Sequence, residues 1–438
     1  MKLVQRRGRH WGLWVAALMV TGWAMPAAAA DLGGDCCADL EERVAELEAT
    51  TARKGNRKVS LTVSGWINES VMWWDDGSES NVYVGTNPVE QSRVRFVGEA
   101  KVTPDVSAGY TLEFGIYGAS GNSWDQNTPD GATPNSVSVR KSSWYLKSKT
   151  LGKVTVGQDG TATYHLLDDA DTTMTRNFYD GEASAIYARP FLLRDATGAP
   201  IGSLKWSDAL RGFFNSTPGD NGRRNIVRYD TPTFAGFSIA TSWGEDDTWD
   251  MAVIYKGELG DFDLNARAGY GQSTDGVSSP CHGSSTAPDN AMDCEWWGVS
   301  AFLQHKPTGL FVFAGYGDQR DGSKNTGIDA AILDKDSQAW FVQGGIEKKF
   351  FPLGKTNFFG QYRRDDAGSS VSGTGTVRTD GAEINTWAIG AAQNLEAAES
   401  TLYLVYQHVD GELTKPGASS ATDLSALQQV VGGMKINF

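Results

Sequence analysis

The residues best suited to chemistry in this chain are arginines and carboxylates that stand at alternate positions of short segments. Arg93 and Arg95 alternate with apolar residues, and Arg140 lies in a similar segment, the hairpin at 136–159. Successive side chains of a strand point to opposite faces, so these charges are expected on the polar face of half-apolar strands. Fixed charges that line a water-filled gap create a field that orients polar solutes without making or breaking bonds.

The alternating pattern stops after Gln158, and a long segment without a repeating pattern runs from about 160 to 222. It contains three carboxylates near its start, Asp168, Asp169 and Asp171. Segments of this length in a compact fold are uncommon and usually functional. An aqueous interior would accept such a segment, whereas lipid would leave its backbone groups unsatisfied. We therefore expect it to fold inward and to bring the aspartates toward Arg93 and Arg140.

Covalent catalysis is the competing chemistry, and the sequence offers little for it. After removal of the signal peptide described below, the histidines are His165, His282, His305 and His408. They fall on different loops or strands, and no serine or cysteine nucleophile signature accompanies them. His165 beside Asp168 could form half of a dyad, so an outer-membrane hydrolase remains the enzyme alternative. We expect no enzyme, no cofactor and no metal.

The hairpin at 136–159 is the clearest element that would position these charges. Strict alternation places Val137, Val139, Ser143 and Tyr145 on one face and Arg140 on the other. The same alternation places Lys141 on the apolar face, where a charged side chain is unexpected. A position at the rim or at a subunit interface is the only explanation that the pattern offers.

The remaining pattern predicts an all-β fold of sixteen antiparallel strands, with short turns at one end and long loops at the other. This asymmetry is typical of a transmembrane β-barrel in a Gram-negative outer membrane, and an even strand count puts both barrel ends in the periplasm. A soluble β-sandwich is the alternative. Residues 75–90 are expected to be a polar loop, and Trp73 and Trp74 to join an aromatic girdle. The later strands are expected at 223–231, 236–244, 248–257, 261–271, 294–305, 309–317, 337–350, 356–364, 382–393, 400–409 and 427–438.

The N-terminal region has a different character. Residues 1–30 read as a secretory signal peptide, with a basic start, a short apolar core and small residues before Asp31. Residues 31–57 are expected to hold a short periplasmic amphipathic helix and a basic linker, because Leu40, Val44 and Leu47 follow helical spacing. A three-stranded coiled coil beneath a trimer is the alternative for this helix. The barrel domain is then 58–438.

Composition supports this organisation. The formal net charge of −14 argues against nucleic acid as a partner. Cys281 and Cys294 bracket a loop, and in an oxidising compartment a disulfide is the expected pairing, with a metal site near His282 as the alternative. The chain ends in a period-two strand whose last residue is Phe438.

The chain from Lys58 to Phe438 resembles a general diffusion porin of the alphaproteobacterial type. The resemblance is carried by 93–99, by 140–147 with 151–158, by 228–236 and by the terminal Phe438. It implies that a third loop folds into a sixteen-stranded barrel and narrows it, with wall arginines facing loop carboxylates. Arg93, Arg140 and Arg228 match the wall arginines, with Arg95 and Glu113 beside them, and Asp168, Asp169 and Asp171 hold the position of the loop acids.

The resemblance also implies a localisation and partners. It implies a homotrimer in the outer membrane, in contact with lipid and lipopolysaccharide, inserted by the barrel-assembly machinery through a signal that includes Phe438. Small hydrophilic solutes and ions would diffuse passively through a water-filled channel. A substrate-selective channel remains open as an alternative, and a run of arginines or an aromatic track through the lumen would favour it.

Overall fold

The computed structural model describes most of the chain beyond residue 58. The described residues are 59–119, 121–131, 135–179, 181, 185–210, 217–244, 247–274, 293–322, 336–368, 370–371, 378–415 and 418–438. The predicted signal peptide at 1–30, the helix and linker at 31–57, and Cys281 lie outside the described residues.

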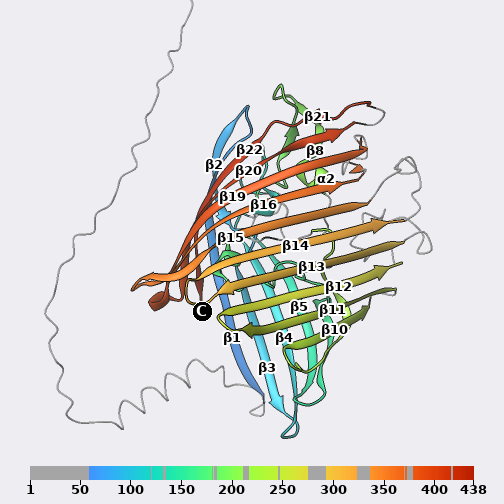
Figure 1. Cartoon of the computed structure of the whole chain (residues 1–438), viewed down its shortest axis with the longest axis vertical. Coiled ribbons are helices and arrows are strands. Elements are labelled where there is room, and N and C mark those ends of the chain that lie inside the picture. The colour runs from blue at the N-terminus through green and yellow to red at the C-terminus, as the bar shows by residue number, and fades with distance from the viewer. Residues whose placement is uncertain are drawn as a thin grey trace, which may run out of the picture. The chain divides into compact units, whose positions relative to one another are not determined.

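In the described part of the chain, sixteen long strands, each antiparallel to its neighbours, form a closed ring, which confirms the predicted barrel. Figure 1 shows these strands side by side along the wall. Backbone pairing of the last strand with the first closes the ring, from Trp66 opposite Asn437 to Asp75 opposite Gln428. Gly65 and Phe438 add two backbone hydrogen bonds of 3.0 Å to this seam. The ring strands are β1 (Ser60–Asp75), β3 (Arg93–Lys101), β4 (Val106–Tyr117), β5 (Ser136–Ser148), β6 (Gly152–Gly160), β9 (Arg223–Asp230), β10 (Phe237–Gly244), β11 (Thr248–Leu259), β12 (Phe262–Ser273), β13 (Cys294–His305), β14 (Leu310–Asp321), β15 (Ser337–Phe351), β16 (Gly354–Ala367), β19 (Gly381–Leu395), β20 (Ser400–Thr414) and β22 (Leu427–Asn437).

One element contradicts the expected polar loop at 75–90. Strand β2 (Ser80–Thr86) pairs with the second half of β1, whereas β3 pairs with the first half. Its alternation is too short to separate from a loop by pattern alone, and β1 is long enough to need a second partner. The other short elements are η1 (Gly121–Ser123), η2 (Met174–Asn177), β7 (Leu192–Arg194), β8 (Pro200–Lys205), α2 (Trp206–Ala209), β17 (Ser370–Val371), β18 (Arg378–Thr379), η5 (Glu396–Ala398) and β21 (Thr422–Asp423).

The outer face of the ring is apolar, with a belt of aromatic residues at one height. Tyr270 lies opposite Trp297 in the strand register, and the Trp297 and Tyr316 rings are 5.1 Å apart. The belt consists of Trp73, Trp243, Trp249, Tyr270, Trp297, Tyr316, Trp340, Tyr362, Trp387 and Tyr406. Such a girdle marks the interface between lipid and water in outer-membrane barrels. Trp74 was expected there too, but it is 1% exposed on the inner face, because adjacent strand residues cannot share a face. No helix in the described ranges is long and apolar enough to span a membrane.

A β-bulge in β5 corrects the predicted faces of the hairpin at 136–159. Glu113 pairs with Lys141 and Phe114 with Val139, so Arg140 is the extra residue. A bulge lets two successive side chains face the same side. Arg140 and Lys141 both point inward, where Lys141 Nζ lies 2.6 Å from Asp159. Beyond the bulge the phase is reversed, so Trp144 joins the outer face and Ser143 and Tyr145 the inner one.

Candidate functional site

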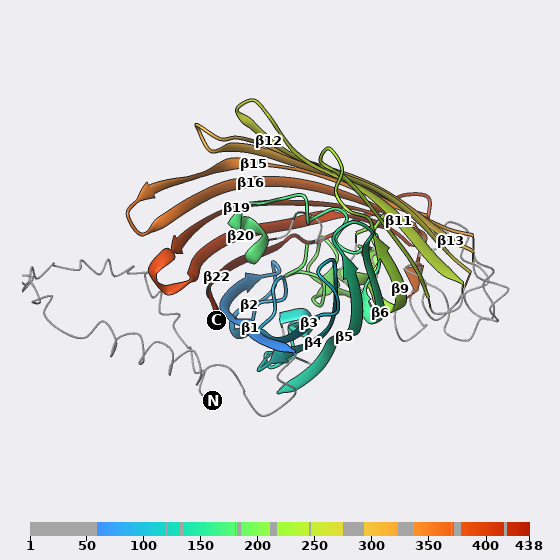
Figure 2. The same ribbon diagram turned by 90° about the horizontal axis from the view of Figure 1, so that it is seen from below.

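The segment between β6 and β9 lies inside the curve of the strands (Figure 2). Its aromatic residues pack against aromatic residues on the inner face of the wall. Phe178 stacks on Tyr403 of β20 with ring centroids 4.9 Å apart, and Tyr179 lies 5.5 Å from Phe359 of β16. Phe178 is fully buried. The segment and this part of the wall therefore share one hydrophobic core.

Hydrogen bonds hold the segment near its start, and close packing against the wall positions it near its end. Near its start, the Asp250 carboxylate on β11 accepts hydrogen bonds from the Ala162 and Thr163 backbone N–H groups at 3.0 and 2.9 Å and from Thr163 Oγ1 at 2.6 Å. Near its end, a β-carbon on Gly317 would lie 1.6 Å from the Pro218 carbonyl oxygen, so only glycine permits this close approach.

The interior is consequently divided into an apolar part and a polar part. Alternation predicts polar side chains along the inner face of every strand, but β14, β15, β16 and β20 carry buried Phe313, Phe341, Phe359 and Tyr403 there. These residues are covered by the inward segment instead of water. Charged inner-face residues are numerous on β3, β4, β5, β6 and β9, and we call this part of the interior the charged side.

Three arginines, Arg93, Arg95 and Arg140, gather around the Glu113 carboxylate. Glu113 on β4 is buried, and it accepts hydrogen bonds from Arg95 Nε at 2.6 Å and Arg140 Nε at 2.8 Å. Arg93 NH1 lies 3.5 Å from Glu113, and its NH2 lies 2.8 Å from Glu90. The positive charges therefore exceed the negative ones in this group.

The predicted pairing of these arginines with the loop aspartates differs from the contacts in the structure. Arg93 and Arg140 form their ion pairs with Glu90 and Glu113, because these carboxylates lie on the same part of the wall. Arg228 pairs with Asp230 on its own strand at 2.7 Å. It also donates to the Gly160 and Thr161 carbonyl oxygens, at 3.1 and 2.7 Å, where the inward segment begins.

The three aspartates have partners inside the segment and on the opposite wall. Asp168 lies 2.8 Å from His165 Nδ1 and 3.1 Å from Arg176 NH2. Asp169 pairs with Arg267 of β12 at 2.9 Å and with Arg176. Sequence reasoning missed Arg267, although its place in the alternating run 261–271 puts it on the inner face with Asn265.

Asp171 is the aspartate whose titration the fold changes most clearly. It is 7% exposed, and its carboxylate accepts from the Thr173 N–H at 2.8 Å and from Gln343 Nε2 at 3.1 Å. Burial raises the pKa of Asp171 from its ordinary 3.8 to about 6. A raised carboxyl pKa in the folded state means that this group favours folding most below pH 3.8 and loses that contribution as pH rises through 6.

Acidification is therefore expected to stabilise the native chain relative to Asp171→Asn. The difference in unfolding midpoint, native minus variant, should increase as pH falls from 7 to 4, and most of the change should occur between pH 6 and 4, the interval between the folded and ordinary pKa values. Thermal unfolding in detergent across this range measures it, with Asp263→Asn as an exposed control. A difference that is independent of pH would contradict the assignment.

Cys294 at the start of β13 is buried and disulfide-bonded. Since Cys281 lies outside the described residues, their pairing stays a prediction.

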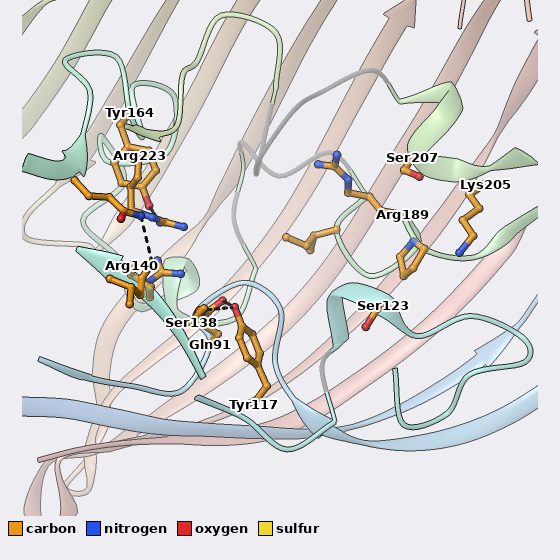
Figure 3. A pocket seen from close by; sticks show the side chains of 14 residues that line it. Gln91, Tyr117, Ser123, Ser138, Arg140, Tyr164, Arg189, Lys205, Ser207 and Arg223 are labelled. Atoms are coloured by element: carbon orange, nitrogen blue, oxygen red, sulfur yellow. Dashed lines mark hydrogen bonds between the residues drawn. The ribbon is translucent and has the colours of Figure 1, made fainter. Parts of the chain in front are cut away.

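Two cavities lie on the charged side of the interior. One, of about 440 Å³, is lined by Arg95, Lys141, Lys153 and Arg228 together with Asp159 and Asp230. The other, of about 620 Å³, lies between Arg140 on the wall and Arg189 on the inward segment (Figure 3). The lining of both cavities carries more cations than carboxylates.

Comparison with known proteins agrees with this architecture. A family profile described as Gram-negative porin matches residues 15–423. The fold is similar to that of an anion-selective porin from Comamonas acidovorans, with a TM-score of 0.55 and 16% identity over 87% of this chain and 100% of that chain. It is also similar to outer-membrane expressed OmpT of Vibrio cholerae, with a TM-score of 0.51 and 13% identity over 88% and 99% of the two chains. A third similar structure is the trimer form of OmpT from Vibrio cholerae, with a TM-score of 0.50 and 16% identity over 87% of this chain and 99% of that chain. No curated protein sequence matches significantly.

Proposed function

The chain belongs to the Gram-negative porin family, and from this premise we propose that its passage runs along β3, β4, β5, β6 and β9 and favours anions. The protein is an outer-membrane channel for the passive diffusion of small hydrophilic solutes and ions. The observation that carries the proposal is the placement of charge: Arg93, Arg95 and Arg140 share the buried Glu113, while the opposite half is filled with packed aromatic residues.

The inward segment narrows the channel in this proposal. Its aromatic core is held against β14, β15, β16 and β20, and its other side faces the arginines across the water that remains. A polar or charged solute that loses water in this gap regains interactions with fixed charges, whereas an apolar solute regains nothing. The passage of cations is disfavoured because the charged groups around Arg93 and Arg140 carry a net positive charge.

The assembly of the protein is proposed on the same basis. The apolar outer face and its aromatic belt suit outer-membrane lipid, with lipopolysaccharide at the rim. Trimerisation through barrel walls follows from membership of the family, and insertion by the barrel-assembly machinery from the exposed terminal Phe438. Native mass measurement in mild detergent that finds only monomers would contradict the trimer.

Replacing Arg93 and Arg140 with Ser is expected to shift selectivity toward cations and to enlarge the passage slightly. A change of about 1 kcal/mol in the electrostatic energy of an anion corresponds to roughly a fivefold change in permeability ratio. Reversal potentials in salt gradients measure the shift, which should shrink at 1 M salt, where the screening length is about 3 Å. Lys306→Gln, at an exposed pair with Glu258, is the matched control.

Replacing Asp168, Asp169 and Asp171 with Asn is expected to give a smaller shift in the opposite direction. Arg176 and Arg267 already compensate two of these charges, and burial favours the neutral form of the third. If neither set of variants changes the reversal potential at low salt, these residues do not line the narrowest part of the passage.

A further inference from the structure

The larger cavity has walls from two separate parts of the chain. Its volume is about 620 Å³, and the barrel contributes Arg140 of β5 and Arg223 of β9. The inward segment contributes Arg189 and Lys205. A solute that passes between wall and segment therefore meets side chains from both.

The charged groups of this cavity are all positive. Arg140, Arg189, Lys205 and Arg223 line it, and no Asp or Glu is among its described lining residues. Carboxylates do approach from outside the lining: Glu113 accepts from Arg140, and Asp125 accepts from Lys205 at 3.1 Å. The Asp365 carboxylate of β16 also interacts electrostatically with Arg189. Arg140, Arg189 and Lys205 line the cavity beside these contacts.

The four cations lie on two sides of the cavity. Figure 3 shows the Arg140 and Arg223 side chains beside Tyr164 on one side, and Arg189 and Lys205 on the other side, apart from each other. Tyr164 orders the first side, since its hydroxyl accepts a hydrogen bond from Arg223 and its ring lies 5.3 Å from the Arg223 guanidinium carbon. An extended anion with a charge at each end matches this arrangement, whereas a compact anion reaches one side only.

The surface between the two sides is mixed in character. Ser138, Ser207 and Tyr117 bring hydroxyl groups, and Ile186 and Pro190 bring apolar surface. Tyr117 is oriented by its 2.7 Å hydrogen bond to Gln91 Oε1. A short methylene chain can lie against such a surface while its two ends keep their polar contacts.

We propose that this cavity is a binding subsite for a small organic dicarboxylate, held with one carboxylate at Arg140 and Arg223 and the other at Arg189 or Lys205. Guanidinium groups suit carboxylates because they donate two parallel hydrogen bonds. The subsite rests on the proposed anion-favouring passage and gives it a substrate class. It makes the channel more than a sieve, because a bound dicarboxylate delays the smaller ions that share its path.

The test is block of the chloride current through single channels in planar bilayers. Succinate, glutarate and adipate are the extended dianions, sulfate is the compact dianion of equal charge, and butyrate is the monoanion. At least one dicarboxylate should block with saturation, at a half-blocking concentration roughly tenfold below those of sulfate and butyrate. The variant Arg189→Gln with Lys205→Gln should remove this advantage and leave block by sulfate unchanged.

Two further arms keep the interpretation specific. Arg364→Gln removes a cation that pairs with Asp366 and Glu383 outside the cavity. Dicarboxylates should block this variant at the same concentrations as the native channel. Lys205→Gln alone is the second variant if the double variant does not assemble, because the Lys205 side chain is partly exposed. This single substitution should weaken dicarboxylate block severalfold. Equal block by sulfate and by all three dicarboxylates overturns the subsite. A native channel whose reversal potential favours cations overturns the proposed passage itself, so the two failures are distinguishable.

Discussion

Glu113→Gln is expected to destabilise the folded barrel by about 3–5 kcal/mol, the typical result of removing one partner from a buried ion pair. The Glu113 side chain is 1% exposed, and its carboxylate contacts Arg93, Arg95 and Arg140. A neutral amide leaves three guanidinium groups close together with only Glu90 as a compensating carboxylate. The temperature at which the compact band converts to the unfolded band on a gel should fall.

The neighbours of Glu113 provide a matched test of this cause. Arg95→Gln in the Glu113→Gln background removes one of the three repelling charges, so it should restore part of the lost stability. The two effects should be non-additive, as expected for residues in direct contact. Glu258→Gln, which alters an exposed pair with Lys306, should change little. A Glu113→Gln variant as heat-resistant as the native chain would show that the arginines do not depend on this carboxylate.

Asp250→Ala is expected to loosen the inward segment, raising single-channel conductance and current noise. Asp250 is 1% exposed and accepts three hydrogen bonds from Ala162 and Thr163, where the segment leaves β6. Hydrogen bonds to a charged acceptor contribute about 1.5–3 kcal/mol each. Without them the first turn of the segment loses its attachment to β11, while the aromatic core around Phe178 remains.

Recordings in 1 M KCl and exclusion of neutral polymers of graded size measure this effect. Asp250→Asn keeps an acceptor and should lie between the native chain and Asp250→Ala. Asp263→Asn, on the same side of the ring but 44% exposed in its side chain, is the control for loss of a carboxylate. Unchanged conductance with unchanged polymer exclusion in Asp250→Ala would mean that the aromatic core alone holds the segment.

The number of ring strands and their order were accessible from the sequence because each has a local cause. Period-two alternation decides which residues can face lipid, and short turns oblige consecutive strands to pair. Strand β2 was missed because the run 80–86 is short and the residues that flank it are polar. Only the length of β1 shows that this strand needs a second partner. The bulge was equally hidden. Arg140 and Lys141 look like an error in the alternation until the opposing Glu113 and Phe114 reveal the extra residue.

The amino-acid pattern is sufficient to predict the barrel, its polar and apolar faces along most strands, and an inward-folding segment that contains carboxylates. Which charges meet depends on the folded arrangement of the chain. Arg93 and Arg140 pair with Glu113 because neighbouring strands bring them together, and Asp169 meets Arg267 because the segment crosses to β12. The folded arrangement also decided that Phe341 and Phe359 face inward, which alternation could not foresee. Periodicity reports that two faces differ, but the contact made by an inner face depends on a segment that is remote in sequence and has no period of its own.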